Sequence, residues 1–179
     1  MADQYMTWFV LGPSGVGKSS FGDYLANIKE WYHLEIDQFL NDGIDTYGLR
    51  QDWDAYYWNL DPTGLITQLK KRTRESGKSN CVLTFPGNLV LSRNHISVVA
   101  NVIKVIYLYG SAARCMTAFL KREQETHRNL GLDHWKTYNC PSYINMSIPE
   151  LETNRVHVWT CGGERREHED VFNEILGWN

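Results

Sequence analysis

One octapeptide constrains this chain more than any other feature, and it reads Gly12-Pro13-Ser14-Gly15-Val16-Gly17-Lys18-Ser19. It satisfies every fixed position of the phosphate-binding pattern G-x-x-x-x-G-K-[ST]. Glycines let such a loop turn tightly, so that several backbone N–H groups point at one phosphate. The lysine places an ammonium beside the β- and γ-phosphates, and the serine hydroxyl ligates Mg²⁺. We therefore expect every residue from Gly12 to Ser20 to contribute to a site for ATP and Mg²⁺.

The segments on either side of this loop have the character that such a loop needs. Thr7–Leu11 is a short apolar run rich in residues that favour strands. After the loop, Phe21, Leu25 and Ile28 recur at helical spacing. The sequence therefore predicts strand, loop and helix in that order, from about residue 7 to residue 28.

The composition is typical of one globular domain, which we assign to residues 1–179. Hydrophobic residues make up 42% and charged residues 22% of the chain, as in ordinary soluble proteins. The net charge of −3 gives no basic surplus for nucleic-acid binding, and no apolar run approaches a membrane span. Four scattered cysteines without a C-x-x-C pair favour a reducing compartment. We expect a cytoplasmic protein, a monomer or a homodimer, whose partners are small molecules.

Apolar runs and helical patterns alternate along the rest of the chain. Further strands are expected near residues 32–37, 81–85, 102–108 and 155–159, and helices near 61–77, 92–100, 111–123 and 164–176. Residues 51–60 are rich in aromatic side chains, and residues 124–140 are polar and basic. Strands that alternate with helices pair in parallel through right-handed crossovers. The predicted fold is therefore α/β, a doubly wound, five-stranded parallel sheet with helices on both faces.

Ligands of such sheets bind beyond the carboxyl ends of the strands. Besides the phosphate loop, the segments that follow strands are Asp37, Pro86-Gly87-Asn88, Gly110-Ser111 and Thr160-Cys161. Asp37 is therefore a candidate for the catalytic base and for the metal site. Glu35 is expected to point to the opposite face if its strand continues.

Over nearly its full length the chain resembles the small P-loop kinases of the shikimate kinase and gluconate kinase type. Glu35-Ile36-Asp37 is similar to the D-x-D of shikimate kinases, and Phe85-Pro86-Gly87-Asn88 keeps one glycine of their acceptor-binding triplet. That departure weakens the case for shikimate itself. The resemblance implies a lid over about residues 122–140 that carries Arg122 and Arg128. It also implies that Arg50 and Arg93 bind an anionic acceptor together with Gly87 and Asp37.

A competing resemblance points to proteins of the uridine kinase type. Ile36-Asp37-Gln38-Phe39 and the later Trp58-Asn59-Leu60-Asp61-Pro62 partly match two motifs of that group. The aromatic side chains of residues 53–58 could stack on a base or a sugar face, or could belong to the core.

Two classes of function remain open from the sequence. The first is a kinase in which Lys18 and the loop hold ATP, Asp37 acts as general base, and Arg122 and Arg128 close over the γ-phosphate. The second is a P-loop NTPase that acts as a switch or motor on a protein partner. No acidic residue ends the strands at Phe85 and Leu108, which favours the kinase. Arg114 and the Thr160–Gly163 loop are candidates for the adenine pocket.

Overall fold

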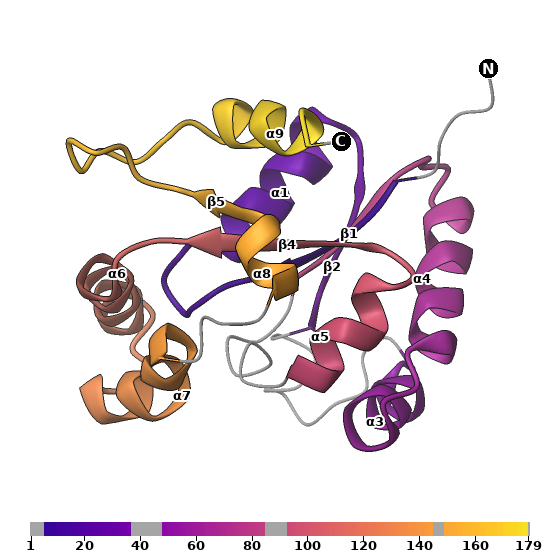
Figure 1. Ribbon diagram of the computed structural model, residues 1–179, viewed down its shortest axis with the longest axis horizontal. Coiled ribbons are helices and arrows are strands. Elements are labelled where there is room, and N and C mark those ends of the chain that lie inside the picture. Colours follow the sequence, from indigo (N-terminus) through magenta and orange to yellow (C-terminus); the bar gives the residue numbers. More distant parts are fainter. Residues whose placement is uncertain (1–5, 37–47, 85–92, 145–148, 179) are drawn as a thin grey trace.

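The structure is a computed structural model that describes residues 6–36, 48–84, 93–144 and 149–178 (Figure 1). Five strands form one sheet in the order β2-β3-β1-β4-β5, and every pair of neighbours is parallel. The sheet confirms the fold class that the sequence predicts. The strands are β1 (Thr7–Leu11), β2 (Tyr32–Glu35), β3 (Cys81–Thr84), β4 (Lys104–Tyr109) and β5 (Arg155–His157).

Helices cover both faces of the sheet. They are α1 (Lys18–Ile28), α3 (Arg50–Asn59), α4 (Thr63–Glu75), α5 (Arg93–Ala100), α6 (Ala112–Glu125), α7 (Leu132–Ile144), α8 (Pro149–Thr153) and α9 (His168–Leu176). The side chains of β1 alternate between two buried clusters, because successive residues of a strand point to opposite faces. Phe9 and Leu11 pack with α3, α4, α5 and α8, whereas Trp8 and Val10 pack with α1, α6, α7 and α9.

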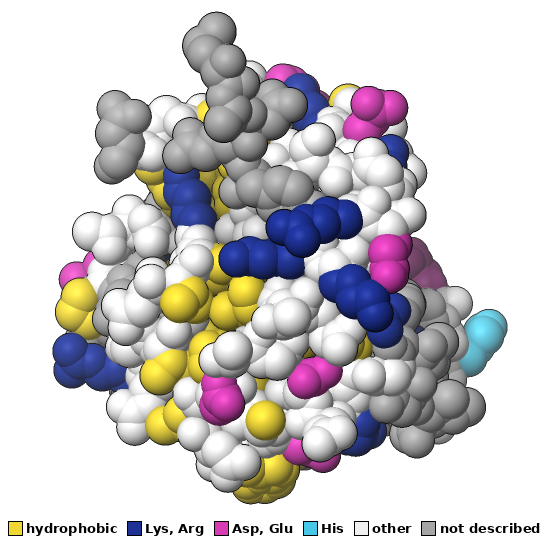
Figure 2. Space-filling view, turned by 90° about the vertical axis from the view of Figure 1, so that its right-hand side faces the viewer, with side chains coloured by type: hydrophobic (Ala, Val, Ile, Leu, Met, Phe, Trp, Pro, Cys, Tyr) yellow, Lys and Arg dark blue, Asp and Glu magenta, His cyan; other side chains and the backbone are white. Residues whose placement is uncertain are grey.

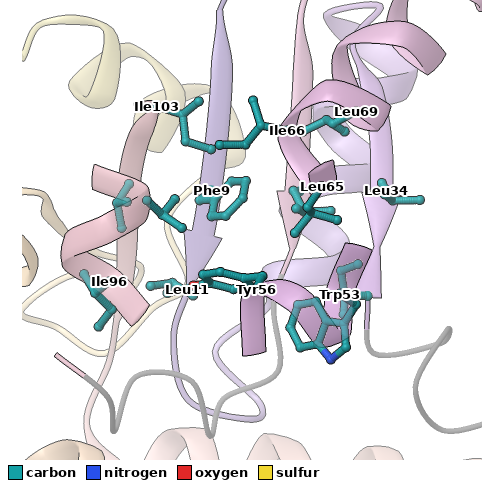
Figure 3. Packing of buried hydrophobic residues seen from close by; sticks show 14 of the residues in the cluster. Phe9, Leu11, Leu34, Trp53, Tyr56, Leu65, Ile66, Leu69, Ile96 and Ile103 are labelled. Carbon is teal, nitrogen blue, oxygen red and sulfur yellow. The ribbon is translucent and has the colours of Figure 1, made fainter. Parts of the chain in front are cut away.

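The first of these clusters joins the sheet to the helices that follow β2 and β3 (Figure 3). Phe9 and Leu11 lie beneath Leu65 of α4 and Tyr56 of α3, and all four side chains are at most 4% exposed. The buried apolar area of this face holds α3 and α4 in place. Within the described residues, no helix is both long and apolar enough to cross a bilayer.

The ends of several elements follow the expected local chemistry. Ser111 caps α6 by accepting a hydrogen bond from the Arg114 amide at 3.3 Å. Asp61 Oδ1 accepts one from the Thr63 amide at 3.0 Å, although α4 begins at Thr63, one residue later than the expected first helical residue, Pro62. Gly77 ends the same helix with a φ of +72°, a conformation that glycine adopts readily.

Three segments without a predicted class are helical, and the shortest of them is α8. Residues 50–59 form α3, where Trp53 and Tyr56 face the core three residues apart. Residues 132–144, which cover part of the expected lid, form α7. The strand predicted over residues 32–37 ends at Glu35. Asp37 and Gly87, two of the expected site residues, lie outside the described residues.

Candidate active site

The phosphate loop joins β1 to α1 at the carboxyl edge of the sheet. Gly15 and Gly17 have φ angles of +88° and +94°, which residues with a Cβ rarely adopt. A methyl group on Gly15 would overlap the backbone carbonyl oxygen of Cys115 in α6. The glycines of the motif are thus required by backbone conformation and by the close approach of α6.

Lys18 lies inside this loop and begins α1. Its side chain is 6% exposed, and Nζ donates hydrogen bonds to the carbonyl oxygens of Gly12 at 3.0 Å and Pro13 at 3.3 Å. The loop therefore bends around the ammonium group. The positive end of the α1 dipole points to the same place, so this concave backbone suits a polyphosphate.

Glu35 joins the loop to β2. The Ser19 hydroxyl donates a hydrogen bond to Glu35 Oε1, and the strand register pairs Glu35 with Thr84 at the end of β3. The expectation that Glu35 faces away from the ligand edge is wrong. Glu35 lies instead at the ligand edge, with its carboxylate against the phosphate loop. A hydroxyl and a carboxylate are hard oxygen donors, which fit Mg²⁺.

A histidine supports this corner of the site. His33 Nδ1 lies 3.1 Å from Asp23 Oδ1 in α1, and its Nε2 lies 3.1 Å from Thr84 Oγ1. The ring therefore ties the carboxyl ends of β2 and β3 to α1. In the sequence, neither metal-ligand spacing nor a known motif marks His33.

Arg165 reaches the loop from the segment between β5 and α9. A methyl group on Gly17 would overlap its guanidinium, which also stacks on Trp159 with 4.8 Å from Cζ to the ring centroid. Loss of water around the group lowers the pKa of Arg165 from its ordinary value. Sequence reasoning missed this residue. The sequence feature that could have indicated Arg165 is its positive charge in the segment after the last strand, at the edge of the sheet where ligands bind.

The candidates for the adenine pocket come together in the structure. A methyl group on Gly163 would overlap the Arg114 guanidinium, so the segment after β5 meets the start of α6. The Gly163 amide donates to the Thr160 carbonyl oxygen at 3.0 Å, which closes a tight turn there. Arg114 and this turn lie beside Gly110, where a methyl group would overlap the ring of Trp159.

The two arginines of the expected lid lie at the end of α6 and just beyond it. Arg122 Nη2 forms an ion pair with Glu123 Oε1 at 3.0 Å, and the guanidinium lies over the ring of Phe119. Arg128 is exposed, and its amide donates to the Glu123 carbonyl oxygen at 2.9 Å. The structure thus places Arg122 against Glu123, an acid that is 2% exposed.

The two arginines expected to bind the acceptor begin helices on the other face of the sheet. Arg50 is the first residue of α3, and Arg93 is the exposed first residue of α5. The two helices are joined by hydrogen bonds, from Tyr56 Oη to the His95 carbonyl oxygen at 3.0 Å and between His95 Nε2 and the Tyr57 carbonyl oxygen at 2.7 Å.

The aromatic cluster of residues 53–58 divides into buried and exposed members. Trp53 and Tyr56 are each 3% exposed and belong to the core, whereas Trp58 is 74% exposed. Burial raises the pKa of Tyr56. Trp53 and Tyr56 therefore fit a role in the core better than a role in stacking on a base or a sugar face.

A second surface feature lies on the outer side of α4. Lys and Arg side chains gather on this side of the molecule (Figure 2), and an open hollow is lined by Thr67, Lys70, Lys71, Arg74 and Glu75. All of these residues come from one helix and none from the loop segments. We therefore do not include this hollow in the active site.

No family model matches the sequence. Shikimate kinase of Enterococcus faecalis (strain ATCC 700802 / V583) is 23% identical over 167 residues, which cover 93% of this chain and 94% of that protein.

Two solved structures cover almost the whole chain. The shikimate kinase from Aquifex aeolicus vf5 is 19% identical, with a TM-score of 0.54 over 96% of this chain and 94% of that one. The shikimate kinase from Acinetobacter baumannii in complex with shikimate is 18% identical, with a TM-score of 0.53 over 97% and 92%. The chain thus has the fold of these two shikimate kinases, and it is similar in sequence to a shikimate kinase over nearly its full length.

Proposed function

We propose that this protein is a cytoplasmic, ATP-dependent kinase that transfers the γ-phosphate of ATP to a hydroxyl group of a small metabolite. The observation that carries the proposal is the hydrogen bond between Ser19 of the phosphate loop and Glu35 of β2. This bond places the carboxylate of Glu35, the last residue of β2, against the Ser19 hydroxyl. That hydroxyl is expected to lie beside the β- and γ-phosphates.

In this proposal the nucleotide occupies the concave loop. The Lys18 ammonium would hold the phosphates together with backbone N–H groups within residues 12–20. Pro13 has no such group, and that of Ser14 is bonded to Asn139. Arg165 would add a second cation near Gly17. Its guanidinium lies so close to Gly17 that a methyl group on that residue would overlap it, which supports this role. Arg114 and the Thr160–Gly163 turn would border the adenine.

Ser19 and Glu35 would hold Mg²⁺ directly or through water, because both offer hard oxygen atoms. When bound, Mg²⁺ would neutralise charge on the β- and γ-phosphate oxygens. Glu35 would at the same time orient the Ser19 hydroxyl.

The acceptor would be activated from the segment that follows β2. Asp37 would orient the attacking hydroxyl and take its proton late in the transfer, and Ser19 and Asp37 remain the metal residues that the sequence predicts. Gly87, Arg50 and Arg93 would bind the acceptor. An anionic acceptor is supported by the position of both arginines at the starts of helices on one face of the sheet.

Arg122 and Arg128 would close over the γ-phosphate and exclude water. The ion pair of Arg122 with Glu123 would have to open during that closure. A dry site would favour transfer to the acceptor over hydrolysis of ATP.

The test is ATP consumption by the purified protein with Mg²⁺ and a panel of hydroxyl compounds: shikimate, gluconate, nucleosides and nucleoside monophosphates. Stimulation by a sugar acid or a ring hydroxyl would support the proposal, and stimulation by a nucleoside would favour the alternative of the uridine kinase type. Hydrolysis that no compound stimulates would contradict a small-molecule kinase and favour a switch that acts on a protein partner.

A further inference from the structure

We propose that Trp135 and Asn139 of α7 are positioning residues for the phosphate loop. Through their hydrogen bonds to the backbone of Ser14, they couple α7 to nucleotide binding. This inference rests on the proposed function, because it assumes that the loop binds a nucleotide. It adds two residues that no motif marks and that lie more than a hundred positions from the loop in the sequence.

Both backbone groups of Ser14 bond to side chains of α7. Its amide donates to Asn139 Oδ1 at 2.7 Å, and its carbonyl oxygen accepts from Trp135 Nε1 at 2.9 Å. Each of these two side chains is 1% exposed. The two hydrogen bonds act on the two peptide units that flank the Ser14 Cα, so together they fix the backbone conformation at this residue as well as its position.

The amide group of Asn139 has one orientation that satisfies both the Ser14 amide and the Trp135 carbonyl oxygen. Its oxygen faces the Ser14 N–H, and its nitrogen donates to the Trp135 carbonyl oxygen at 2.9 Å. A flipped amide would oppose donor to donor and acceptor to acceptor. The network is thus directional, and Asn139 also sets the turn of α7 that carries Trp135.

A buried amide is not what hydrophobic packing of α7 would require. Among residues 132–140, Trp135 and Asn139 are the buried side chains, and they lie one turn apart on the same side of the helix. Trp135 packs with the core on the α1 face, whereas a polar group buried there is stable only when hydrogen-bonded. The hydrogen bond between Asn139 and Ser14 therefore indicates that a polar residue is buried at this position of α7 because it contacts the phosphate loop.

The contact decides which loop amides are left for a phosphate. Pro13 has no N–H group, and the Ser14 N–H is held by Asn139. After Ser14, the first amide that this arrangement leaves for a phosphate is that of Gly15. The backbone of Gly15 lies so close to the Cys115 carbonyl oxygen of α6 that a methyl group on Gly15 would overlap it. Lys18 is also bonded inside the loop. Contacts from α6, from α7 and from this lysine therefore hold the phosphate loop together.

Coupling of this kind acts in both directions. If α7 holds the loop in the shape that binds phosphate, a bound nucleotide must stabilise α7 to the same extent. Helix α7 follows the expected lid arginine Arg128. Nucleotide occupancy would therefore be communicated to the part of the chain that is expected to close over the γ-phosphate.

The experiment measures ADP binding with Mg²⁺ by calorimetry for the wild type and for two variants. Trp135→Phe removes the Nε1 donor and keeps an aromatic ring in the core. Asn139→Ala removes both bonds of the amide. The matched control is Tyr138→Ala, on the same helix, where the side chain is 44% exposed. Circular dichroism and thermal melting establish that each protein is folded.

We expect ADP to bind about fivefold more weakly to Trp135→Phe and about tenfold more weakly to Asn139→Ala, as loss of one or two buried hydrogen bonds implies, while Tyr138→Ala binds as the wild type does. The KM for ATP should rise with a smaller change in kcat, because the loop shape acts on nucleotide affinity. Folded variants with unchanged ADP affinity would overturn the inference alone. A wild type that does not bind ADP would overturn the proposed function as well.

Hydrogen exchange gives a readout that requires no folded alanine variant. In the wild type, backbone amides of residues 132–140 should exchange more slowly when ADP is bound. In Trp135→Phe this protection should shrink. Equal exchange in α7 with and without ADP, while the loop itself is protected, would contradict the coupling.

Discussion

On the α1 face of the sheet, the phosphate loop is held by backbone conformation and by three helices. Lys18 bonds carbonyl oxygens inside the loop, Gly15 abuts α6, and Ser14 bonds to α7. On the opposite face, Arg50 and Arg93 begin α3 and α5, and the helices between them pack through a core of aromatic and aliphatic side chains. In the proposed function, the nucleotide half of the site is thus built largely from backbone atoms, and the acceptor half from side chains.

This difference explains which half a sequence can reveal. A backbone cradle needs glycines at fixed positions, so the same letters recur wherever the cradle is used. A side-chain site changes its letters with each acceptor, as in Phe85-Pro86-Gly87-Asn88, where one glycine stands in place of a triplet. Variants on the two faces should accordingly fail in different ways.

The largest effect is expected at Lys18, the one side chain of the loop that carries charge. Lys18→Ala should lower kcat/KM for phosphoryl transfer about 1000-fold, because it removes a cation that stabilises the transferring phosphate. Its circular dichroism spectrum should match that of the wild type. Lys29→Ala, which removes a cation paired with Glu169 behind the site, is the control. Full turnover by Lys18→Ala would contradict the mechanism.

Gly15 and Gly48 offer a matched comparison of the two faces. Both have positive φ angles, +88° and +63°, but a methyl group on Gly48 meets no atom within 4 Å. Gly48→Ala should cost about 1 kcal/mol from the left-handed conformation alone, or about 2–4 °C in melting temperature. Gly15→Ala adds overlap with Cys115 and should cost about 3 kcal/mol, or about 6–12 °C. Equal melting temperatures would show that the loop is not braced by α6.

Glu35 tests the link between the faces. Glu35→Gln keeps the shape of the side chain and removes its charge, so we expect kcat to fall about 10- to 100-fold and the Mg²⁺ concentration for half-maximal activity to rise. Glu167→Gln, at an exposed position before α9, serves as the control. An unchanged Mg²⁺ dependence in Glu35→Gln would remove Glu35 from the metal site.

Arg165 sharpens the comparison within the nucleotide half. Arg165→Ala should raise the KM for ATP about tenfold, since a guanidinium beside a phosphate makes charge-assisted hydrogen bonds, and should leave the KM for the acceptor unchanged. Arg166→Ala is the neighbouring control, because Arg166 pairs with Glu174 at 2.7 Å. A rise in the acceptor KM alone would place Arg165 in the wrong half of the site.

The smallest effect concerns pH. Burial, and then the charge of Arg165, lower the pKa of His168 at the start of α9. The unfolded chain therefore takes up this proton first as the pH falls below about 6.5. Stability contributed by neutral His168 is present above that pH and is lost as the pH falls toward the lower folded-state pKa.

His168→Gln should consequently lose less melting temperature than the wild type between pH 7 and pH 5. His127→Asn, in an exposed turn with a φ of +53° that asparagine tolerates, is the control and should keep the wild-type slope. A steeper acid dependence in His168→Gln would reverse the sign of the argument.

Sequence patterns were sufficient for the parallel sheet and the phosphate loop, because strand alternation and glycine spacing are local. They did not identify α3 as a helix, since its aromatic residues suit either class and two of them turn toward the core. The expected direction of Glu35 was wrong, because β2 ends at this residue and its side chain bonds to Ser19 of the loop. Trp135, Asn139 and Arg165 could not be found this way, since each acts on the loop from a distant part of the chain.

The most direct test of the account is the ratio of phosphorylated acceptor to ADP formed, measured by mass spectrometry with the acceptor that most stimulates ATP consumption. A kinase of the proposed kind gives one phosphorylated acceptor for each ADP, and that ratio should hold until the acceptor is consumed. Release of one free phosphate for each ADP, with no phosphorylated acceptor, would contradict phosphoryl transfer and identify the protein as a nucleotide hydrolase.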